Sequence, residues 1–285
     1  MRAQIATHAG VTDLMRQYKY LPKKSLGQNF LTDPGVVDKI VSAARITRED
    51  CVIEIGPGLG GLTQVLSDRA AAVMAVEIDK RLVAILKEVF ADNSRIEILE
   101  GDILKTSVNA LMKERGWQTA KLTANIPYYI TTPVILGLLE NHCPLSLITV
   151  IVQLEVAERL TAKPGGKEYG ALSLAAAYYA DVSLAAIVPR NCFFPRPHVS
   201  SAIVILDKKK PLLNPYDEEM LFKCIKAAFS HRRKTLINCL RAQDWVNKGR
   251  EELLAILQTC GFDENIRGEE LSLDEFIRLA YTLNA

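Results

Sequence analysis

The chain has 285 residues, of which 49% are hydrophobic and 24% are charged. This length allows one large α/β domain and a second, smaller domain, and the composition is typical of a soluble globular protein. No apolar run approaches the ~20 residues needed to span a bilayer, so we expect no membrane partner. The first ten residues lack the apolar stretch of a secretory signal and the six cysteines form no C-x-x-C pair, which together predict a cytoplasmic protein with reduced thiols.

In chain order, strand and helix patterns alternate through the first half of the sequence. A helix is expected from Val36 to Ala44, because Asp33 can cap its first turn and Pro34 is favoured there. Short apolar runs then predict five strands, over 51–55, 72–78, 96–100, 122–125 and 147–154, with helices over 61–69 and 80–90. Strands that alternate with helices predict an α/β fold with a parallel, doubly wound, Rossmann-like sheet.

The pattern changes after about residue 207. The segments 208–211 and 214–215 are typical of a linker, because they combine lysines, an asparagine and prolines. Beyond them the apolar periodicity is helical, with candidate helices over 221–240, 251–259 and 273–283. We therefore predict an α/β domain over residues 1–207 and a small all-helical domain over residues 208–285.

The formal net charge of +2 hides an uneven distribution of charged residues. Basic residues without an acidic neighbour occupy the stretches 16–24 and 223–241, whereas the stretch 251–275 is rich in Asp and Glu. Basic faces of this kind suit binding to a polyanion such as a nucleic acid, although helix faces that are simply solvated have the same pattern.

A glycine-rich loop follows the first predicted strand and opens a helix. Gly56 and Gly58 let the backbone turn tightly and let a ligand approach without meeting a Cβ atom. With Gly61 they satisfy G-x-G-x-x-G, the dinucleotide fingerprint, and Glu77 lies 21 residues after Gly56 at the end of the next strand. On the loop alone, an NAD-dependent enzyme is therefore a second interpretation.

Three features favour S-adenosylmethionine as the ligand instead. Glu54 precedes the first glycine in the E-x-G-x-G-x-G form seen in methyltransferases, and Pro57 removes an N–H that a pyrophosphate would need. Asp102 follows the third strand, where its carboxylate can accept from the amine of an adenine, and Glu77 can accept from both ribose hydroxyls. No metal is expected at such a site.

The segment from Asn125 to Tyr128, Asn-Ile-Pro-Tyr, follows the fourth predicted strand, at the sheet edge where ligands bind in such folds. An adenine N6 amine is a poor nucleophile, because its lone pair is delocalised into the ring. The Asn125 side-chain oxygen and a backbone carbonyl held by the proline can accept the two amine hydrogens and favour attack on a methyl group. Tyr128 can stack on one face of the adenine, and Phe194, in the rigid run 193–198, is the candidate for the other face.

Together these residues resemble those of the ribosomal RNA adenine dimethyltransferases, and of the bacterial small-subunit enzymes in particular. The resemblance covers nearly the whole chain, although the extension up to residue 20 matches only loosely. Its landmarks are KSLGQNFL at 24–31, the glycine loop at 54–63, NIPYYITTP at 125–133, FPRPHVSSA at 194–202 and FSHRRKTL at 229–236.

The resemblance implies an S-adenosylmethionine-dependent enzyme that adds two methyl groups to the N6 amine of each of two adjacent adenines near the 3′ end of 16S ribosomal RNA. It implies that Gln28, Asn29 and Leu31 help to hold the methionine part of the cofactor. It also implies that the helical domain contacts the RNA or the ribosome. The implied partner is the assembling small ribosomal subunit, and we expect the enzyme to be a monomer.

Two other interpretations share part of this pattern. A relative that methylates large-subunit RNA has the same cofactor site and the same Asn-x-Pro-Tyr/Phe turn, and only the C-terminal segments 229–236 and 273–280 favour the small subunit. An RNA-binding or transcription-accessory protein that keeps the fold without catalysis is the other. The intact turn from Asn125 to Tyr128 argues against it.

Overall fold

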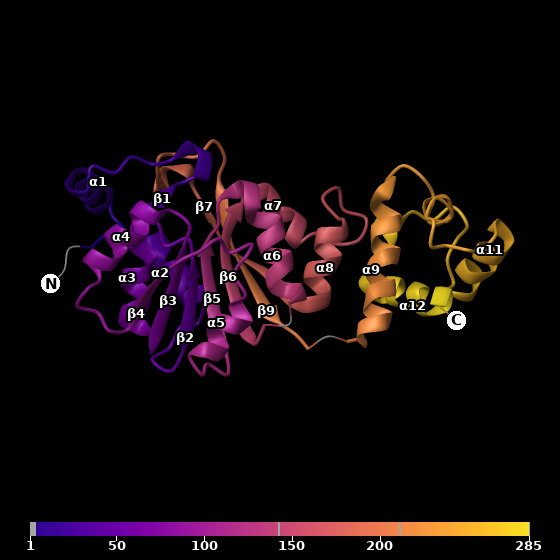
Figure 1. The fold of residues 1–285 in the computed structure, drawn as a ribbon. Helices are drawn as coiled ribbons and strands as arrows, with labels where there is room; N and C mark the ends of the chain where they lie inside the picture. Colours follow the sequence, from indigo (N-terminus) through magenta and orange to yellow (C-terminus); the bar gives the residue numbers. More distant parts are fainter. Residues whose placement is uncertain (1–3, 142, 211, 285) are drawn as a thin grey trace. The chain divides into compact units, whose positions relative to one another are not determined.

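The computed structural model describes residues 4–141, 143–210 and 212–284, which form two compact units (Figure 1). The first unit contains the described residues up to Ala157 together with Asp181–Lys208, and the second contains Glu158–Ala180 and the described residues from Lys209 onward. One boundary therefore falls at the start of the expected linker, whose Pro211 lies outside the described residues. The segment Glu158–Ala180 belongs to the second unit by its contacts, although the sequence pattern placed it in the domain 1–207.

Seven strands form the main sheet, in the order β4-β3-β2-β5-β6-β9-β7. They are β2 (Cys51–Ile55), β3 (Ala72–Glu77), β4 (Ile96–Glu100), β5 (Ala120–Asn125), β6 (Leu145–Gln153), β7 (Ala180–Val188) and β9 (Ser201–Lys208). Strands β2 to β6 pair in parallel, which confirms the predicted α/β fold and its five strands. The sheet is mixed rather than wholly parallel, because β9 runs antiparallel to β6.

Strands β7 and β9 have no counterpart among the predicted elements. The run from Ala202 to Val204 is fully buried in β9, so its apolar pattern is a strand signal to which the sequence analysis assigned no element. Strand β7 is one of the two edge strands of the sheet, and only its end residues, Ala180 and Val188, are buried. An edge strand with little burial has almost no alternation for a sequence pattern to detect.

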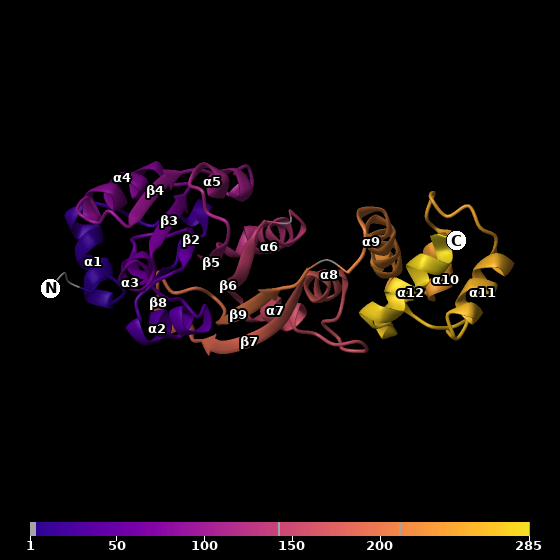
Figure 2. The same cartoon turned by 90° about the horizontal axis from the view of Figure 1, so that it is seen from below.

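Helices cover both faces of the sheet. Figure 2 shows α2 (Pro34–Ala43) on one side of it and α5 (Val108–Glu114) and α6 (Thr131–Glu140) on the other. The predicted cap of α2 is confirmed, since the Asp33 carboxylate accepts a hydrogen bond from the backbone N–H of Val36 at 3.2 Å. The remaining helices of this part are α1 (His8–Gln17), α3 (Gly61–Arg69), α4 (Lys80–Val89) and α7 (Leu154–Leu160).

Apolar side chains of α2 and α3 attach these helices to the sheet. Val37 and Ile40 of α2 and Leu66 of α3 lie in one buried cluster with Val52 of β2 and Val73 of β3. Each of these side chains is at most 1% exposed. Burial of this extent stabilises the fold by about 1.5–3 kcal/mol for each large aliphatic side chain. The packing holds the carboxyl ends of the strands at fixed positions, where the site is formed.

Helices and the loops between them make up almost all of the described part of the second unit. Its helices are α8 (Ala171–Tyr179), α9 (Pro215–Ser230), α10 (Leu236–Arg241), α11 (Arg250–Thr259) and α12 (Leu273–Asn284). Helix α8 joins this unit because the hydroxyls of Tyr178 and Tyr179 both donate to the Glu218 carboxylate of α9. This contact, between residues about 40 positions apart, explains why the segment 158–180 groups with the C-terminal helices.

The prediction of a single helix over 221–240 is wrong, because the chain is not helical between the end of α9 at Ser230 and the start of α10 at Leu236. The Arg232 guanidinium lies in this break and donates to the carbonyls of Lys167 and Tyr169 at 3.0 and 3.2 Å. It also pairs with Glu269 at 3.1 Å. These tertiary contacts stabilise a turn that the helical periodicity of the sequence does not show. Among the helices described, none is long and apolar enough to cross a membrane.

Candidate active site

The glycine loop joins the end of β2 to the start of α3. Gly56 and Gly58 have φ angles of 69° and 60°, in the left-handed region that side chains disfavour. A Cβ atom on Gly58 would lie 2.8 Å from Cδ1 of Phe30, which belongs to β1 (Phe30–Leu31). The loop therefore needs glycine both for its backbone conformation and for its close approach to β1.

Glu77 ends β3 beside this loop and is 5% exposed. Its Oε2 accepts a hydrogen bond from the N–H of Gly58 at 3.2 Å, and its Oε1 accepts one from the N–H of Asp79 at 2.9 Å. Burial raises the pKa of this carboxyl, and the backbone hydrogen bonds oppose part of the rise. Each carboxylate oxygen has a second lone pair, so the group can still accept two further hydrogen bonds.

Asp102 follows β4, the next strand of the sheet. Its Oδ1 accepts a hydrogen bond from the N–H of Leu104 at 3.1 Å, and its Oδ2 lies 3.8 Å from the Nζ of Lys105. One oxygen is thus held by the backbone, while the other has only a long ion pair at the surface. The carboxylate is fixed in orientation and keeps acceptor capacity for a ligand.

Asn125 is the last residue of β5 and opens the turn to Tyr128. Its Nδ2 donates to the carbonyl of Asn29 at 3.0 Å, and a carbonyl can only accept, so the orientation of the amide is determined. The Asn125 Oδ1 is consequently available as an acceptor. The Tyr128 hydroxyl forms a 2.8 Å hydrogen bond with the Oγ of Ser201, and burial raises the pKa of this phenol.

The residues expected to hold the methionine part of the cofactor lie on the N-terminal segment that leads into β1. Gln28 has its carboxamide oxygen within 2.7 Å of both the Tyr20 hydroxyl and the Lys23 N–H. Asn29 donates its side-chain N–H to the carbonyl of Gly27 at 3.0 Å. Leu31 is 7% exposed. The side chains of Gln28 and Asn29 are therefore held by protein contacts before any ligand is considered.

One cavity brings these elements together at the carboxyl ends of the parallel strands, and we call it the strand-end cavity. Nine of the ten site residues predicted from the sequence line it, namely Gln28, Asn29, Leu31, Gly56, Gly58, Glu77, Asp102, Asn125 and Tyr128. The cavity thus combines glycines in the left-handed backbone conformation, two carboxylates and an oriented amide. No group of three or more His, Cys, Asp or Glu side chains in the described part of the chain is placed to hold a metal ion.

Phe194 is the predicted residue that is not part of this wall. It lies in β8 (Phe193–Phe194), which pairs antiparallel with β1 so that Phe194 is opposite Phe30. Its ring meets the ring of His8 edge-on, with the centroids 5.7 Å apart. The structure does not bring Phe194 and Tyr128 together into a base sandwich, so a direct role of Phe194 on the substrate stays a prediction.

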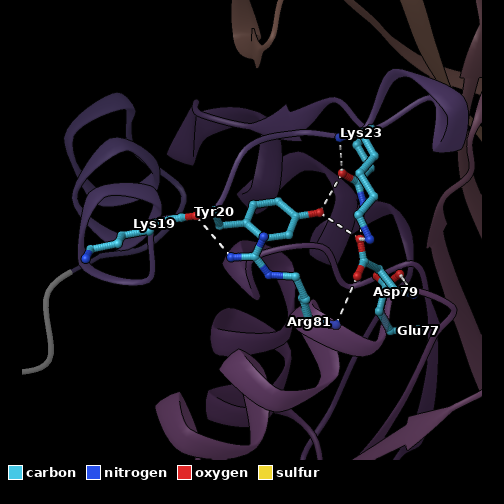
Figure 3. Close-up of polar contacts among 7 residues, drawn as sticks. Lys19, Tyr20, Lys23, Glu77, Asp79 and Arg81 are labelled. Atoms are coloured by element: carbon cyan, nitrogen blue, oxygen red, sulfur yellow. Dashed lines mark hydrogen bonds and ion pairs between the residues drawn. The ribbon is translucent and has the colours of Figure 1, made fainter.

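Several residues of the site region were missed by the sequence analysis. Tyr20, Lys23 and Asp79 each form a hydrogen bond with the Gln28 side chain. Figure 3 shows Tyr20 and Lys23 beside Asp79. Tyr129 lines the strand-end cavity and is 60% exposed. Asp79 could have been predicted from the sequence, because it follows the end of a predicted strand, as other site residues do. The pairing of Tyr20 with Asp79 has no such signal, because the two residues are 59 positions apart.

A family model described as ribosomal RNA adenine dimethylase matches residues 21–284 of the chain. The chain belongs to this family. It is thus a methyltransferase, which confirms the class of enzyme predicted from the sequence and excludes the NAD-dependent alternative that the glycine loop left open. The expectation that the loop serves a methyltransferase also explains Pro57, which a pyrophosphate-binding loop would not favour.

Known relatives of this ribosomal RNA adenine dimethylase are similar over nearly their full lengths. The ribosomal RNA small subunit methyltransferase A of Clostridioides difficile is 43% identical over 99% of this chain and 97% of its own, and that of Lachnoclostridium phytofermentans is 45% identical over 94% and 93%. Among solved structures, a dimethyladenosine transferase from Plasmodium falciparum has a TM-score of 0.74 and 30% identity, with 87% of this chain and 95% of that chain covered. The 23S rRNA methyltransferase ErmE has a TM-score of 0.70 and 26% identity, with coverages of 90% and 100%.

Proposed function

We propose that this family member transfers methyl groups from S-adenosylmethionine to the N6 amines of two adjacent adenines near the 3′ end of 16S ribosomal RNA, two methyl groups to each. The small-subunit methyltransferases at 43% and 45% identity support the choice of the small subunit as the partner. We further propose that the enzyme acts in the cytoplasm as a monomer on the assembling subunit. The observation that carries the proposal is the oriented Asn125 amide in the same cavity as Glu77 and Asp102.

The polar groups of the strand-end cavity fit S-adenosylmethionine. Glu77 has free lone pairs on both oxygens for the ribose hydroxyls, and Asp102 has an oxygen for the adenine amine. The carboxyl of Glu54 is 2% exposed, and its Oε2 has no hydrogen-bond partner among the described residues, so it is a further polar group that a ligand can satisfy. When bound, S-adenosylmethionine supplies a methyl group activated by its positively charged sulfonium.

The contribution of the chain itself is to orient the target amine. Asn29 holds the Nδ2 of Asn125, which leaves Oδ1 to accept a hydrogen from an adenine N6 amine. An accepted hydrogen bond draws the amine away from planarity and makes its lone pair available. Tyr128, anchored through its hydroxyl to Ser201, offers its ring for stacking on the adenine. Orientation of this kind can supply a large part of the rate enhancement, and no strong general base is needed.

Substitution of Asn125 by Ala tests the proposed catalytic role. We expect Asn125→Ala to lose methyl transfer by at least about a hundredfold while it retains most of its affinity for S-adenosylhomocysteine, because the amide orients the substrate. Asn109→Ala is the matched control, since the side chain of that exposed asparagine donates to the carbonyl of Asn141 and does not line the strand-end cavity. Full activity of the purified Asn125→Ala protein would remove the residue from the mechanism.

The choice of RNA is tested by transfer of tritiated methyl groups to unmethylated small and large ribosomal subunits, followed by mapping of the labelled base. We expect label on two adjacent adenines of the small-subunit RNA. The likeness to a 23S rRNA methyltransferase makes the large subunit the necessary comparison. Label on large-subunit RNA alone would overturn the proposed substrate.

A further inference from the structure

The buried carboxylate of Asp79 is the centre of a polar cluster that the proposed function does not use. Its Oδ2 accepts a hydrogen bond from the Tyr20 hydroxyl at 2.9 Å and one from the Gln28 Nε2 at 3.3 Å. The Nζ of Lys23 pairs with the same oxygen at 2.8 Å. Figure 3 shows Tyr20 and Lys23 reaching Asp79 from the N-terminal segment. One carboxylate therefore holds three side chains of the segment 20–28.

The same residue is joined to the strand-end cavity through its backbone. The Asp79 N–H donates to Oε1 of Glu77 at 2.9 Å, and Glu77 is the carboxylate proposed for the ribose. The Asp79 Oδ1 accepts from the N–H of Arg81 at 2.9 Å and so caps α4. The Arg81 guanidinium in turn donates to the carbonyl of Lys19 at 3.0 Å, as Figure 3 shows. The N-terminal segment is thus tied to the end of β3 at two points.

The electrostatics favour an ionised Asp79. Its side chain is 0% exposed, and this burial raises the pKa, but the hydrogen bonds from Lys23, Arg81, Tyr20 and Gln28 outweigh it and hold the pKa below the usual value. A buried carboxylate is stable only while its partners are in place. The position of the segment 20–28 therefore depends on this charge.

The cluster also determines which end of the Gln28 carboxamide faces which partner. The backbone N–H of Lys23 can only donate, and it lies 2.7 Å from the Gln28 Oε1, so that atom is the oxygen. The Tyr20 hydroxyl oxygen lies 2.7 Å from this oxygen and 2.9 Å from the Asp79 Oδ2, so its single proton is shared between the two acceptors. The Gln28 Nε2 gives one hydrogen to Asp79, which leaves its second hydrogen without a partner among these residues. Gln28 lines the strand-end cavity.

We propose that Asp79 is a positioning residue of the methyl-donor site, which holds the segment 20–28 at the strand-end cavity and presents the free Nε2 hydrogen of Gln28 to an acceptor oxygen of the bound cofactor. The inference rests on the proposed use of S-adenosylmethionine. Asp79 itself touches no reacting atom, so its loss affects binding of the cofactor and leaves the chemical step intact once the site is saturated. The acceptor oxygen belongs either to the ribose or to the methionine carboxylate.

Asp79→Asn is the sharpest test, because Asn caps a helix as well as Asp, while it removes the charge and replaces one acceptor oxygen by an N–H donor. We expect Kd for S-adenosylhomocysteine and KM for S-adenosylmethionine to rise about tenfold, the effect of losing one charged hydrogen bond, while kcat on small-subunit RNA stays within about twofold. Asp38→Asn is the matched control, since Asp38 pairs with Arg69 on the surface and is 60% exposed. Tyr20→Phe, which deletes one hydroxyl, is expected to raise Kd less and decides the question if Asp79→Asn does not fold.

The outcomes separate this inference from the proposed function. Unchanged Kd and KM in folded Asp79→Asn or Tyr20→Phe, with wild-type activity on small-subunit RNA, would overturn the positioning role alone. A fall in kcat at saturation with unchanged KM would also overturn it. The cofactor oxygen that accepts from Gln28 is identified with 5′-methylthioadenosine, which has the ribose but lacks the methionine carboxylate. Gln28→Ala weakens the binding of this compound only if the acceptor oxygen belongs to the ribose. If the wild-type protein binds S-adenosylhomocysteine but methylates no small-subunit RNA, the proposed RNA substrate is wrong. The Kd values of the variants then still test the positioning role of Asp79.

Discussion

Glu54 and Glu77 are two buried carboxyl groups in the wall of the same cavity, and their surroundings differ. Glu77 receives a backbone N–H on each oxygen, whereas the Oε2 of Glu54 has no partner among the described residues. Burial raises the pKa of Glu54 to about 8, and the charge of Glu77 adds to the rise. Glu54 is therefore mostly protonated at neutral pH, whereas the backbone N–H groups that reach Glu77 favour the charged form of that side chain.

Glu54→Gln tests this difference through the pH dependence of stability. Between the ordinary pKa of 4.5 and the folded value of about 8, the folded protein holds a proton that the unfolded chain releases. The contribution of this proton to the free energy of unfolding is complete below pH 4.5. It is lost as the pH rises toward the folded pKa of about 8, by up to about 1.4 kcal/mol for each pH unit. We expect urea unfolding of the cofactor-free proteins from pH 5 to 8 to show a shallower decline for Glu54→Gln than for wild type. Parallel curves would contradict the raised pKa.

The glycine loop shows at the scale of one element how backbone conformation and packing combine. It lies between β2 and α3, and β1 covers it through Phe30. Strand β1 is in turn paired with β8, in which Phe194 lies opposite Phe30. Phe194 does not line the strand-end cavity, but it packs against the cluster that contains Phe30 and so supports the loop indirectly.

Gly58→Ala is expected to disturb this element more than an ordinary glycine replacement. The φ angle of 60° costs an alanine about 1–2 kcal/mol, and the new Cβ would meet Phe30 Cδ1 at 2.8 Å. Gly116→Ala is the control, because Gly116 has a φ angle of 68° but a methyl group added there would have nothing within 4 Å. We expect urea unfolding to show a larger loss for Gly58→Ala, and titration with S-adenosylhomocysteine to show weaker binding for that variant alone. Equal losses in the two variants would show that the contact with Phe30 has no effect.

At the scale of the whole molecule, the chain divides into an α/β unit with the strand-end cavity and a helical unit with the basic stretch 223–241. The break between α9 and α10 gives neighbouring arginines different roles. Arg232 is bound to Glu269 and to two carbonyls of the segment 158–180, so it holds the helical unit together. Arg233 is exposed. We infer that Arg233, rather than Arg232, contacts RNA phosphates.

Charge reversal separates the two arginines. Arg233→Glu is expected to weaken binding to small ribosomal subunits at low salt and to lower the salt dependence of log K by about one, because one phosphate contact is lost. Arg232→Glu is expected to lower Tm instead, since it places a carboxylate beside Glu269. Arg69→Glu, at a surface residue of α3 in the other unit, controls for the change in net charge. Identical binding of Arg233→Glu and wild type across a salt series would reject this contact.

Sequence patterns were sufficient for features that are local in the chain. The five parallel strands, the Asp33 cap and the boundaries of α3 each depend on a few consecutive residues. Most of the strand-end cavity was predictable for the same reason. Its glycines, carboxylates and the Asn125 turn each follow a strand, and the carboxyl ends of parallel strands meet at one edge of a sheet.

Features that depend on contacts between distant residues were decided by the tertiary structure alone. Strand β9 reverses the sheet direction, Arg232 interrupts a helical pattern, and Glu218 joins the segment 158–180 to the C-terminal helices. The Asp79 cluster links residues 51 and 59 positions apart, and its buried charge is stable because the fold brings Tyr20, Lys23 and Gln28 to it. The sequence by itself predicted the class of fold, the family and most of the residues that line the cavity, because these follow from short motifs at strand ends. Which groups are buried, which way each amide faces and which arginine is held by contacts within the protein depend on long-range packing, which only the tertiary structure supplies.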